Sequence, residues 1–471
     1  MTRLPIVKPQ RPQPVPSAET RTGDASGLFG ARLFLIISSG YLMSYGLRAI
    51  NATIAPELVA EMALSNTQLG SLTSAYFLAF ACMQLPLGVC LDRFGPRRVD
   101  ALLMAVAAAG CVTFAVAGSF EELWIARALL GAGFSAGLMA PFALFRVWFA
   151  PRQQTRLAAW TMMVGTAGVL IATLPVRALL AVMDWRGVFL ICAGLLLTIS
   201  LLMWFGLPRS REPGADAGNA AHAAQAGDAS DASDCGDAVR SGKAGDLGAG
   251  RQSLLQSLGG YREVIRSSFF WRMVLMSGAV QGGFIAMQTL WLGPWFTRVL
   301  GMTPQASAGA LFVFNAALLC TYLLAGYLAP LVGPQERTTV RLTAVAALLV
   351  AVVVGFIAAV PAIAGVWAWL LLAAITTVFT PIQARVGMSF PTRLAGRALT
   401  AYNLVLFLAT FFVQSVLGVT MDWVIAAGFT EQEAFRIALA GIAAVQFAAW
   451  LLFIFWPAQR LPLVAPPAVR Y

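Results

Sequence analysis

The sequence predicts an all-α membrane protein with twelve transmembrane helices in two pseudo-symmetric six-helix bundles. Three observations support this fold class. Of the 471 residues, 59% are hydrophobic and only 11% are charged, whereas a typical soluble domain has about 25% charged residues. Apolar runs of about twenty residues, the length that a bilayer core requires of a helix, recur along the chain. The two halves also share short motifs at a nearly constant offset.

The repeated motifs lie in corresponding connections of the two halves. The tripeptide Met-Asp-Trp at 183–185 recurs at 421–423, 238 positions later. The same offset relates Gly88, Asp92 and Gly95 to Gly326, Pro330 and Gly333, and an offset of 240 relates Pro141 and Pro151 to Pro381 and Pro391. Two parallel six-helix repeats around a cavity at the membrane midplane are typical of secondary transporters.

The elements follow in order from the composition. Residues 1–30 are Pro-rich and polar, which predicts a cytoplasmic tail rather than a signal peptide. The first bundle, 31–207, has spans expected at 31–53, 68–90, 99–117, 123–147, 157–181 and 188–207. Residues 208–268, rich in Ala, Gly, Asp and Ser, cannot bury a core and predict a disordered cytoplasmic linker with a short helix near 254–266. The second bundle, 269–457, has spans expected at 269–291, 305–328, 340–360, 366–388, 398–420 and 435–456, before a cytoplasmic tail at 458–471.

The basic residues predict the orientation. If both termini are cytoplasmic, 26 of the 32 Lys and Arg fall in cytoplasmic segments or the adjoining helix ends. The other six are Arg48, Arg127, Arg177, Arg186, Arg298 and Arg436. This positive-inside bias predicts insertion in a bacterial inner membrane with both termini in the cytoplasm. It also explains the net charge of +11 without a nucleic-acid partner.

The residue types that carry most enzyme and metal chemistry are sparse. The six cysteines show no metal-binding spacing, and the one histidine, His222, lies in the predicted linker. The chain has no G-x-x-x-x-G-K-[ST] pattern, which argues against direct ATP hydrolysis. We therefore expect no catalytic site, no metal site, no cofactor and no enzymatic activity.

Residues 88–98, between the second and third spans, form a short cationic turn that resembles the loop 2–3 motif of the major facilitator superfamily, G-x-x-x-D-R-x-G-R-R. The matching positions are Gly88, Asp92, Arg93, Gly95, Arg97 and Arg98. In this motif Gly88 permits close helix packing, and Gly95 permits a tight turn. Asp92 can cap a neighbouring helix N-terminus and pair with a nearby arginine. The resemblance implies the major facilitator fold, with this loop latching the cytoplasmic side.

A second motif begins at Arg127 in the fourth span. Residues 127–133, Arg-Ala-Leu-Leu-Gly-Ala-Gly, resemble the R-x-x-x-G-x-G motif of the same superfamily. Its glycines, Gly131 and Gly133, allow close packing of helices. Arg127 can either bond backbone carbonyls of the first helix or relay charge. The resemblance covers 31–207 and 269–457 and is more specific in the first half.

Arg48 is the leading candidate for substrate binding. All 21 acidic residues lie outside the predicted spans, apart from Asp100 at a helix edge, whereas arginines enter the membrane. A charge at the bilayer centre costs about 2.5–3.5 kcal/mol or more, so an embedded cation without a carboxylate suggests an anion site. Residues 45–58 resemble helix 1 of the superfamily's organic-anion symporters and organophosphate antiporters, although Leu47 replaces the acidic residue that often precedes the arginine. The alternative is an arginine that reaches outward to the membrane surface.

Other polar side chains could complete a pocket, or could bond neighbouring helices instead. They are Tyr45, Gln281, Gln288, Asn403 and Arg385. Gln281 and Gln288 are seven residues apart, which predicts one shared face of an α-helix. Arg385, near the cytoplasmic end of the tenth span, is either an anion clamp or a surface-reaching cation. Trp291 and Trp295 are expected in the interfacial aromatic belt.

The predicted function is proton-coupled symport of a small organic anion, with a carboxylate favoured, by a monomer in the lipid bilayer. Without a buried carboxylate, the substrate or an arginine-linked site would have to mediate proton coupling. Export of a drug or metabolite is the first alternative, although the fifth span lacks the G-x-x-x-G-P-x-x-G-G motif of drug antiporters. A non-transporting membrane receptor on the same fold is the second.

Overall fold

The computed structural model describes residues 27–137, 139–149, 151–207, 261–332 and 336–456. The first half contains α1 (Gly27–Ala49), α2 (Asn51–Met62), α3 (Asn66–Phe94), α4 (Pro96–Val116), α5 (Phe120–Gly133), α6 (Met139–Trp148), α7 (Pro151–Ile171), α8 (Leu174–Leu179), α9 (Trp185–Leu201) and the π-helix η2 (Leu202–Gly206). Most of the predicted linker and both predicted tails lie outside the described residues, although α1 already begins within the predicted N-terminal tail.

The second half also consists mainly of helices within its described residues. It contains α12 (Ser268–Ser277), η3 (Gly278–Gly282), α13 (Gly283–Ala286), η4 (Met287–Trp291), α14 (Leu292–Pro294), η5 (Trp295–Val299), α15 (Pro304–Val332), α16 (Glu336–Ala359), α17 (Pro361–Ala364), α18 (Trp367–Thr376), η6 (Thr377–Phe379), α19 (Thr380–Met388), α20 (Thr392–Ala426) and α21 (Glu431–Phe455). The elements from α12 to η5 form one continuous span in which α and π turns alternate.

The predicted fold class is confirmed. Among the described residues, nine helices are long and apolar enough to cross a membrane. Three further spans complete the predicted twelve, namely α3, the pair α5–α6, and the run from α18 to α19. The protein is therefore an integral membrane protein of two six-helix halves.

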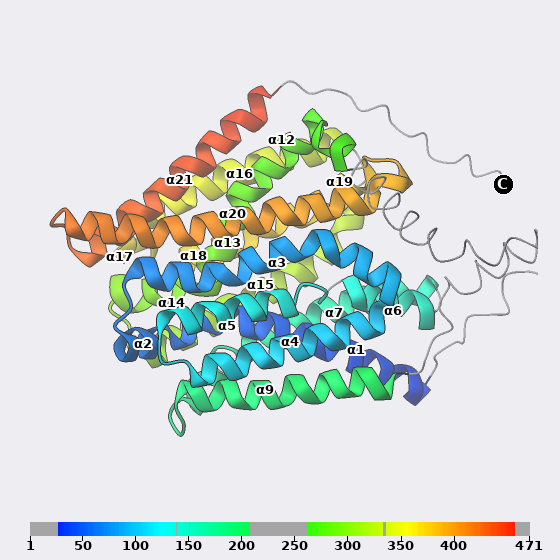
Figure 1. Ribbon diagram of the computed structural model, residues 1–471. Coiled ribbons are helices and arrows are strands. Elements are labelled where there is room, and N and C mark those ends of the chain that lie inside the picture. Colours follow the sequence, from blue (N-terminus) through cyan, green and yellow to red (C-terminus); the bar gives the residue numbers. More distant parts are fainter. Residues whose placement is uncertain (1–26, 138, 150, 208–260, 333–335, 457–471) are drawn as a thin grey trace, which may run out of the picture.

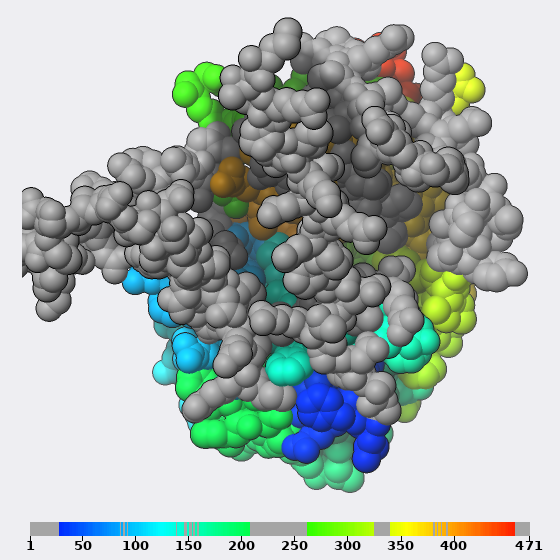
Figure 2. Space-filling model, turned by 90° about the vertical axis from the view of Figure 1, so that its right-hand side faces the viewer, coloured from blue at the N-terminus to red at the C-terminus, as the bar shows by residue number. Residues whose placement is uncertain are grey.

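Each half has its own apolar core, and α3 and α20 lie side by side where the halves meet (Figure 1). We call the end where α3 and α4 meet at Gly95 the inner end, because the sequence predicts that it faces the cytoplasm. The outer end is the one where α3 begins at Asn66. Seen from the inner end, atoms of the first half occupy the lower part of the molecule and atoms of the second half the upper part (Figure 2).

Local sequence signals explain where several helices begin. Ser65 and Gln68 form a capping box at the start of α3, and Thr430 and Glu433 form one at the start of α21. The Asp184 side chain accepts a hydrogen bond from the Gly187 N–H at 2.8 Å and so caps α9. These caps extend the helices beyond the apolar runs, which is why they start earlier than the sequence predicts.

Candidate functional site

Arg48 lies in the last turn of α1, but it is far from the outer end of the first span. The chain turns at Ile50 and continues as α2 for twelve residues, which adds about 18 Å of helix beyond Arg48. The residue is half-buried. This position does not fit the alternative of an arginine that reaches the membrane surface from a helix end.

The Arg48 guanidinium is surrounded by aromatic rings. Its central carbon lies 4.6 Å from the ring centroid of Tyr45, 5.6 Å from that of Tyr76 and 5.7 Å from that of Phe80. The Phe407 centroid, from α20 in the second half, is 5.6 Å away. The rings of Phe80 and Phe407 are themselves 4.4 Å apart. The cation therefore lies between the two halves, held by cation–π contacts from both.

The hydrogen-bonding capacity of this group is not fully used. Arg48 Nε is buried and has no hydrogen-bond partner, and the hydroxyl of Tyr76 is in the same condition. Within the described part of the chain, no Asp or Glu forms an ion pair with Arg48. A buried donor without an acceptor costs free energy, and a carboxylate could accept from both groups. The arrangement is thus suited to an anionic ligand.

Arg127 connects this site to α5. It is completely buried, and its Nη1 donates to the backbone oxygen of Leu47 at 2.9 Å, so it bonds a carbonyl of the first helix. The guanidinium carbon lies 5.0 Å from the Phe114 centroid and 5.8 Å from that of Phe189. Since Leu47 precedes Arg48, Arg127 fixes the backbone that carries the candidate binding residue.

The two glycines after Arg127 lie at close helix contacts. A Cβ built on Gly131 would lie 2.0 Å from the backbone oxygen of Tyr76, and one on Gly133 would lie 2.6 Å from the nitrogen of Ala107. Backbone approaches of this kind need glycine. They position α5 against both α3 and α4.

Gly131→Ala is expected to destabilise the first half by about 1–3 kcal/mol, because α3 and α5 must separate to admit the methyl group. Gly194→Ala is the matched control, since a Cβ there meets no atom within 4 Å. Thermal unfolding of the detergent-purified variants measures the difference. An equal unfolding temperature for both variants would contradict the assigned role of Gly131.

The cationic loop has the expected turn. Gly95 joins α3 to α4 with φ of 79°, a conformation that glycine adopts readily. Arg97 Nη1 donates to the Leu207 oxygen at 2.9 Å, which ties the loop to the end of the sixth span. Arg93 lies over the Phe94 ring, and Arg98 is exposed. Gly88 lies in α3, whereas the side chain of Asp92 is outside the described part.

The other predicted pocket residues are engaged differently. Gln288 Nε2 donates to Asn315 Oδ1 at 2.8 Å, and Gln383 Nε2 donates to Asn403 Oδ1 at 2.9 Å. Gln281 lies in η3 and Arg385 in α19, both half-buried. The π turns between Gln281 and Gln288 break the α-helical period, so their seven-residue spacing does not fix a shared face.

One carboxylate departs from the expectation for acidic residues. Asp100 lies inside α4 and is 1% exposed, and its Oδ1 has no hydrogen-bond partner among the described residues. The expectation that no carboxylate is buried was therefore wrong, because the cap at Gly95 starts the helix one turn before the apolar run.

Nothing in the sequence indicated that Phe80 and Phe407 contact Arg48, since phenylalanine in an apolar span carries no functional signal.

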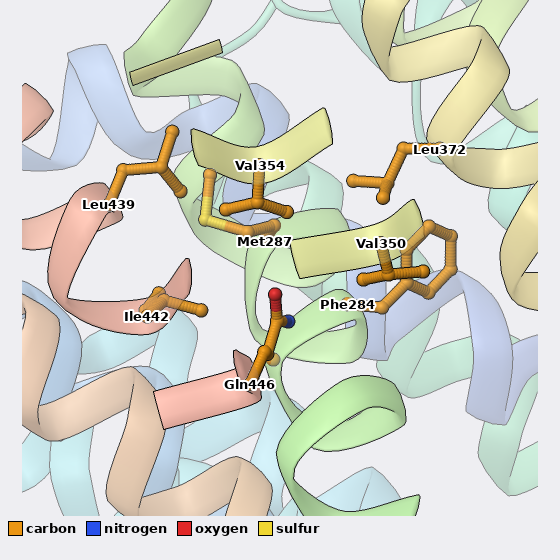
Figure 3. A pocket seen from close by; sticks show the side chains of 9 residues that line it. Phe284, Met287, Val350, Val354, Leu372, Leu439, Ile442 and Gln446 are labelled. Atoms are coloured by element: carbon orange, nitrogen blue, oxygen red, sulfur yellow. The ribbon is translucent and has the colours of Figure 1, made fainter. Parts of the chain in front are cut away.

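A cavity in the second half is too small for a metabolite. It measures about 10 Å³, room for one water molecule, and is lined by apolar side chains including Met287, Val354 and Leu439. The carboxamide of Gln446 points into it (Figure 3), and its Nε2 donates to the Ala279 oxygen at 3.4 Å. This cavity is therefore not a substrate site, and the contacts and unpartnered donor at Arg48 keep that residue as the candidate.

Comparisons with known proteins agree on one family. A family model described as Major Facilitator Superfamily matches residues 37–414. A probable L-galactonate transporter of Escherichia coli K12 is 31% identical over 180 residues, 38% of this chain and 39% of that protein. A hexuronate transporter of the same strain is 28% identical over 188 residues, 39% of this chain and 43% of that protein. The matches thus span about two-fifths of these relatives.

A solved structure shows the same fold over nearly the whole chain. The crystal structure of a D-xylose-proton symporter superposes with a TM-score of 0.68 at 16% sequence identity. The superposition covers 92% of this chain and 98% of that one. At this identity the likeness concerns the fold alone.

Proposed function

The chain belongs to the major facilitator superfamily, and from that premise we propose that it is a secondary active transporter of a small organic anion. The favoured substrate is a monocarboxylate of the sugar-acid class. We further propose that it works as a monomer by proton-coupled symport. It would lie in a bacterial inner membrane with both termini in the cytoplasm. The two halves rock around the Arg48 site to give alternating access.

The unpaired cation at Arg48 carries this proposal. Its guanidinium lies between the halves, within 5.7 Å of four ring centroids, and its Nε lacks an acceptor. A carboxylate would supply that acceptor and neutralise the charge. The resemblance to transporters named for galactonate and hexuronate supports an acid of this class. The amide side chains of the pairs Gln288–Asn315 and Gln383–Asn403 bond each other, and could instead form hydrogen bonds with hydroxyl groups of the substrate.

Two further proposals concern gating. Gly88, Asp92, Arg93, Gly95, Arg97 and Arg98 would latch the inner end, as the family motif implies. A second proposal is that movement at the Arg48 site is coupled to α3 through Arg127, Gly131 and Gly133. Arg127 bonds Leu47, which precedes Arg48, and Gly131 contacts Tyr76 of α3. Tyr45 would stack on Arg48, while Gln281 and Arg385 would line the inner side of the pathway.

Counterflow in proteoliposomes tests the function. Vesicles loaded with unlabelled L-galactonate or galacturonate, and separately with other carboxylates, should accumulate the same labelled compound transiently. A receptor gives no counterflow with any compound. An exporter gives counterflow but, under an imposed proton gradient, moves the anion in the opposite direction from a symporter. Counterflow of neutral or cationic compounds alone would overturn the anion proposal.

A further inference from the structure

We propose that Asp422 is the latch that holds the outer end closed, by capping the first turn of α3 across the boundary between the two halves. The inference rests on the proposed alternating access, and it assigns the outer gate to a residue outside both family motifs. Asp422 lies near the outer end of α20, in the second half, whereas α3 belongs to the first.

The Asp422 carboxylate accepts three hydrogen bonds from the start of α3. Its Oδ1 accepts from the Asn66 backbone N–H at 3.2 Å and from Asn66 Nδ2 at 2.8 Å. Its Oδ2 accepts from the Thr67 backbone N–H at 2.7 Å. The first N–H groups of a helix lack partners within the helix and carry partial positive charge. A carboxylate from the other half is therefore well matched to them.

Arg298 extends the latch. Its Nη1 donates to Asn66 Oδ1 at 2.7 Å and to Glu431 Oε1 at 2.7 Å. The Asn66 amide consequently donates to Asp422 and accepts from Arg298, which fixes its orientation. The network joins α3 in one half to η5, α20 and α21 in the other. All these contacts lie at the outer end.

The backbones around the latch are in direct contact, so the closure is close-packed. A Cβ built on Gly418 would lie 2.2 Å from the Asn66 oxygen, and one on Gly70 would lie 2.7 Å from the Gln414 oxygen. Nearer the midplane, Ser415 Oγ donates to Ser74 Oγ at 2.9 Å. Opening the outer end must therefore separate α3 from α20 and break the Asp422 cap.

The internal repeat gives a matched comparison. Asp184 occupies the position equivalent to Asp422, in the first copy of Met-Asp-Trp. Its side chain caps α9 within its own half through the Gly187 N–H. Aspartate at the same repeat position thus caps a helix of its own half in the first copy and a helix of the other half in the second. Only the cap formed by Asp422 can change the balance between the outer-open and outer-closed conformations.

Asp422→Asn tests the latch with little change in shape. The amide keeps one acceptor, but its NH₂ group faces donors on Asn66 or Thr67, and the charge is lost. Losing a charge-assisted contact of this kind should raise the outer-open population about ten- to a hundredfold. Spin labels at Glu121→Cys and Ala427→Cys, both exposed at the outer end, report the separation of the halves by pulsed electron spin resonance in a background without the native cysteines.

The expected result is a new long-distance population in Asp422→Asn, with Asp184→Asn and the parent showing only the short one. Arg298→Gln should produce the same population to a smaller extent. Identical distance distributions for Asp422→Asn and the parent would overturn the proposal. Because this readout needs no substrate, it is independent of the counterflow result. A failure of the anion proposal would therefore leave the latch assignment separately testable.

Discussion

Arg48→Gln is expected to abolish binding of the transported anion while leaving the fold intact. The guanidinium contacts four aromatic rings and has an unpartnered Nε. Losing a charge-assisted hydrogen bond costs roughly 1.5–3 kcal/mol, which lowers affinity about ten- to a hundredfold. Arg48→Lys keeps the charge but not the planar fork, so it should restore binding only in part. Calorimetric titration with the anion that gives counterflow measures the affinity of the parent protein, Arg48→Gln and Arg48→Lys.

The control for Arg48→Gln is Arg266→Gln, which makes the same chemical change at an exposed position. It should bind like the parent. If Arg48→Gln binds the anion normally, or if it unfolds while the surviving fraction keeps its affinity, Arg48 is a structural residue. Export of a neutral or cationic compound would then explain the protein better.

Gly293→Ala is expected to prevent closure of the outer end and to stop transport. Gly293 lies in α14, and a Cβ there would lie 2.0 Å from the Ala52 oxygen of α2, against 3.4–4 Å for an ordinary contact. The methyl group can be admitted only if the halves move apart. Substrate binding from the outer side should persist, since the clash does not touch the Arg48 site.

Transport and labelling together measure this effect. Gly293→Ala should show no counterflow, and a cysteine at Ser415, which contacts Ser74 across the closed boundary, should become reactive from the outside. Gly309→Ala, where a Cβ meets no atom within 4 Å, should behave like the parent. Normal counterflow by Gly293→Ala would show that the outer end need not close as tightly as this structure does.

Much of the architecture could be predicted because it depends on composition. Apolar length predicts twelve spans and the repeated motifs predict two halves, without knowledge of any side-chain contact. The turn at Gly95 and the bond from Arg127 to the first helix follow from motif chemistry, and the structure contains both. These features are local or repeat a family pattern.

The remaining features depend on how the spans pack. Trp291 and Trp295 were expected at the membrane interface, but both are 0% exposed and belong to the apolar core of the second half. Phe407 reaches Arg48 from 359 positions away in the chain, and no spacing rule connects them. The repeated Met-Asp-Trp motif marks Asp422 in the sequence, but its contacts with the start of the other half's α3 are evident only once α20 is placed beside α3.

Simultaneous measurement of anion uptake and lumenal pH in proteoliposomes tests the central proposal most directly. The vesicles contain a trapped pH-sensitive dye and have no imposed gradient, and labelled galacturonate or L-galactonate is added outside. Coupled symport predicts that the lumen acidifies as label enters, and that Arg48→Gln shows neither signal. Entry of label at constant lumenal pH would contradict proton coupling. Absence of both signals for every carboxylate tested would contradict anion transport itself.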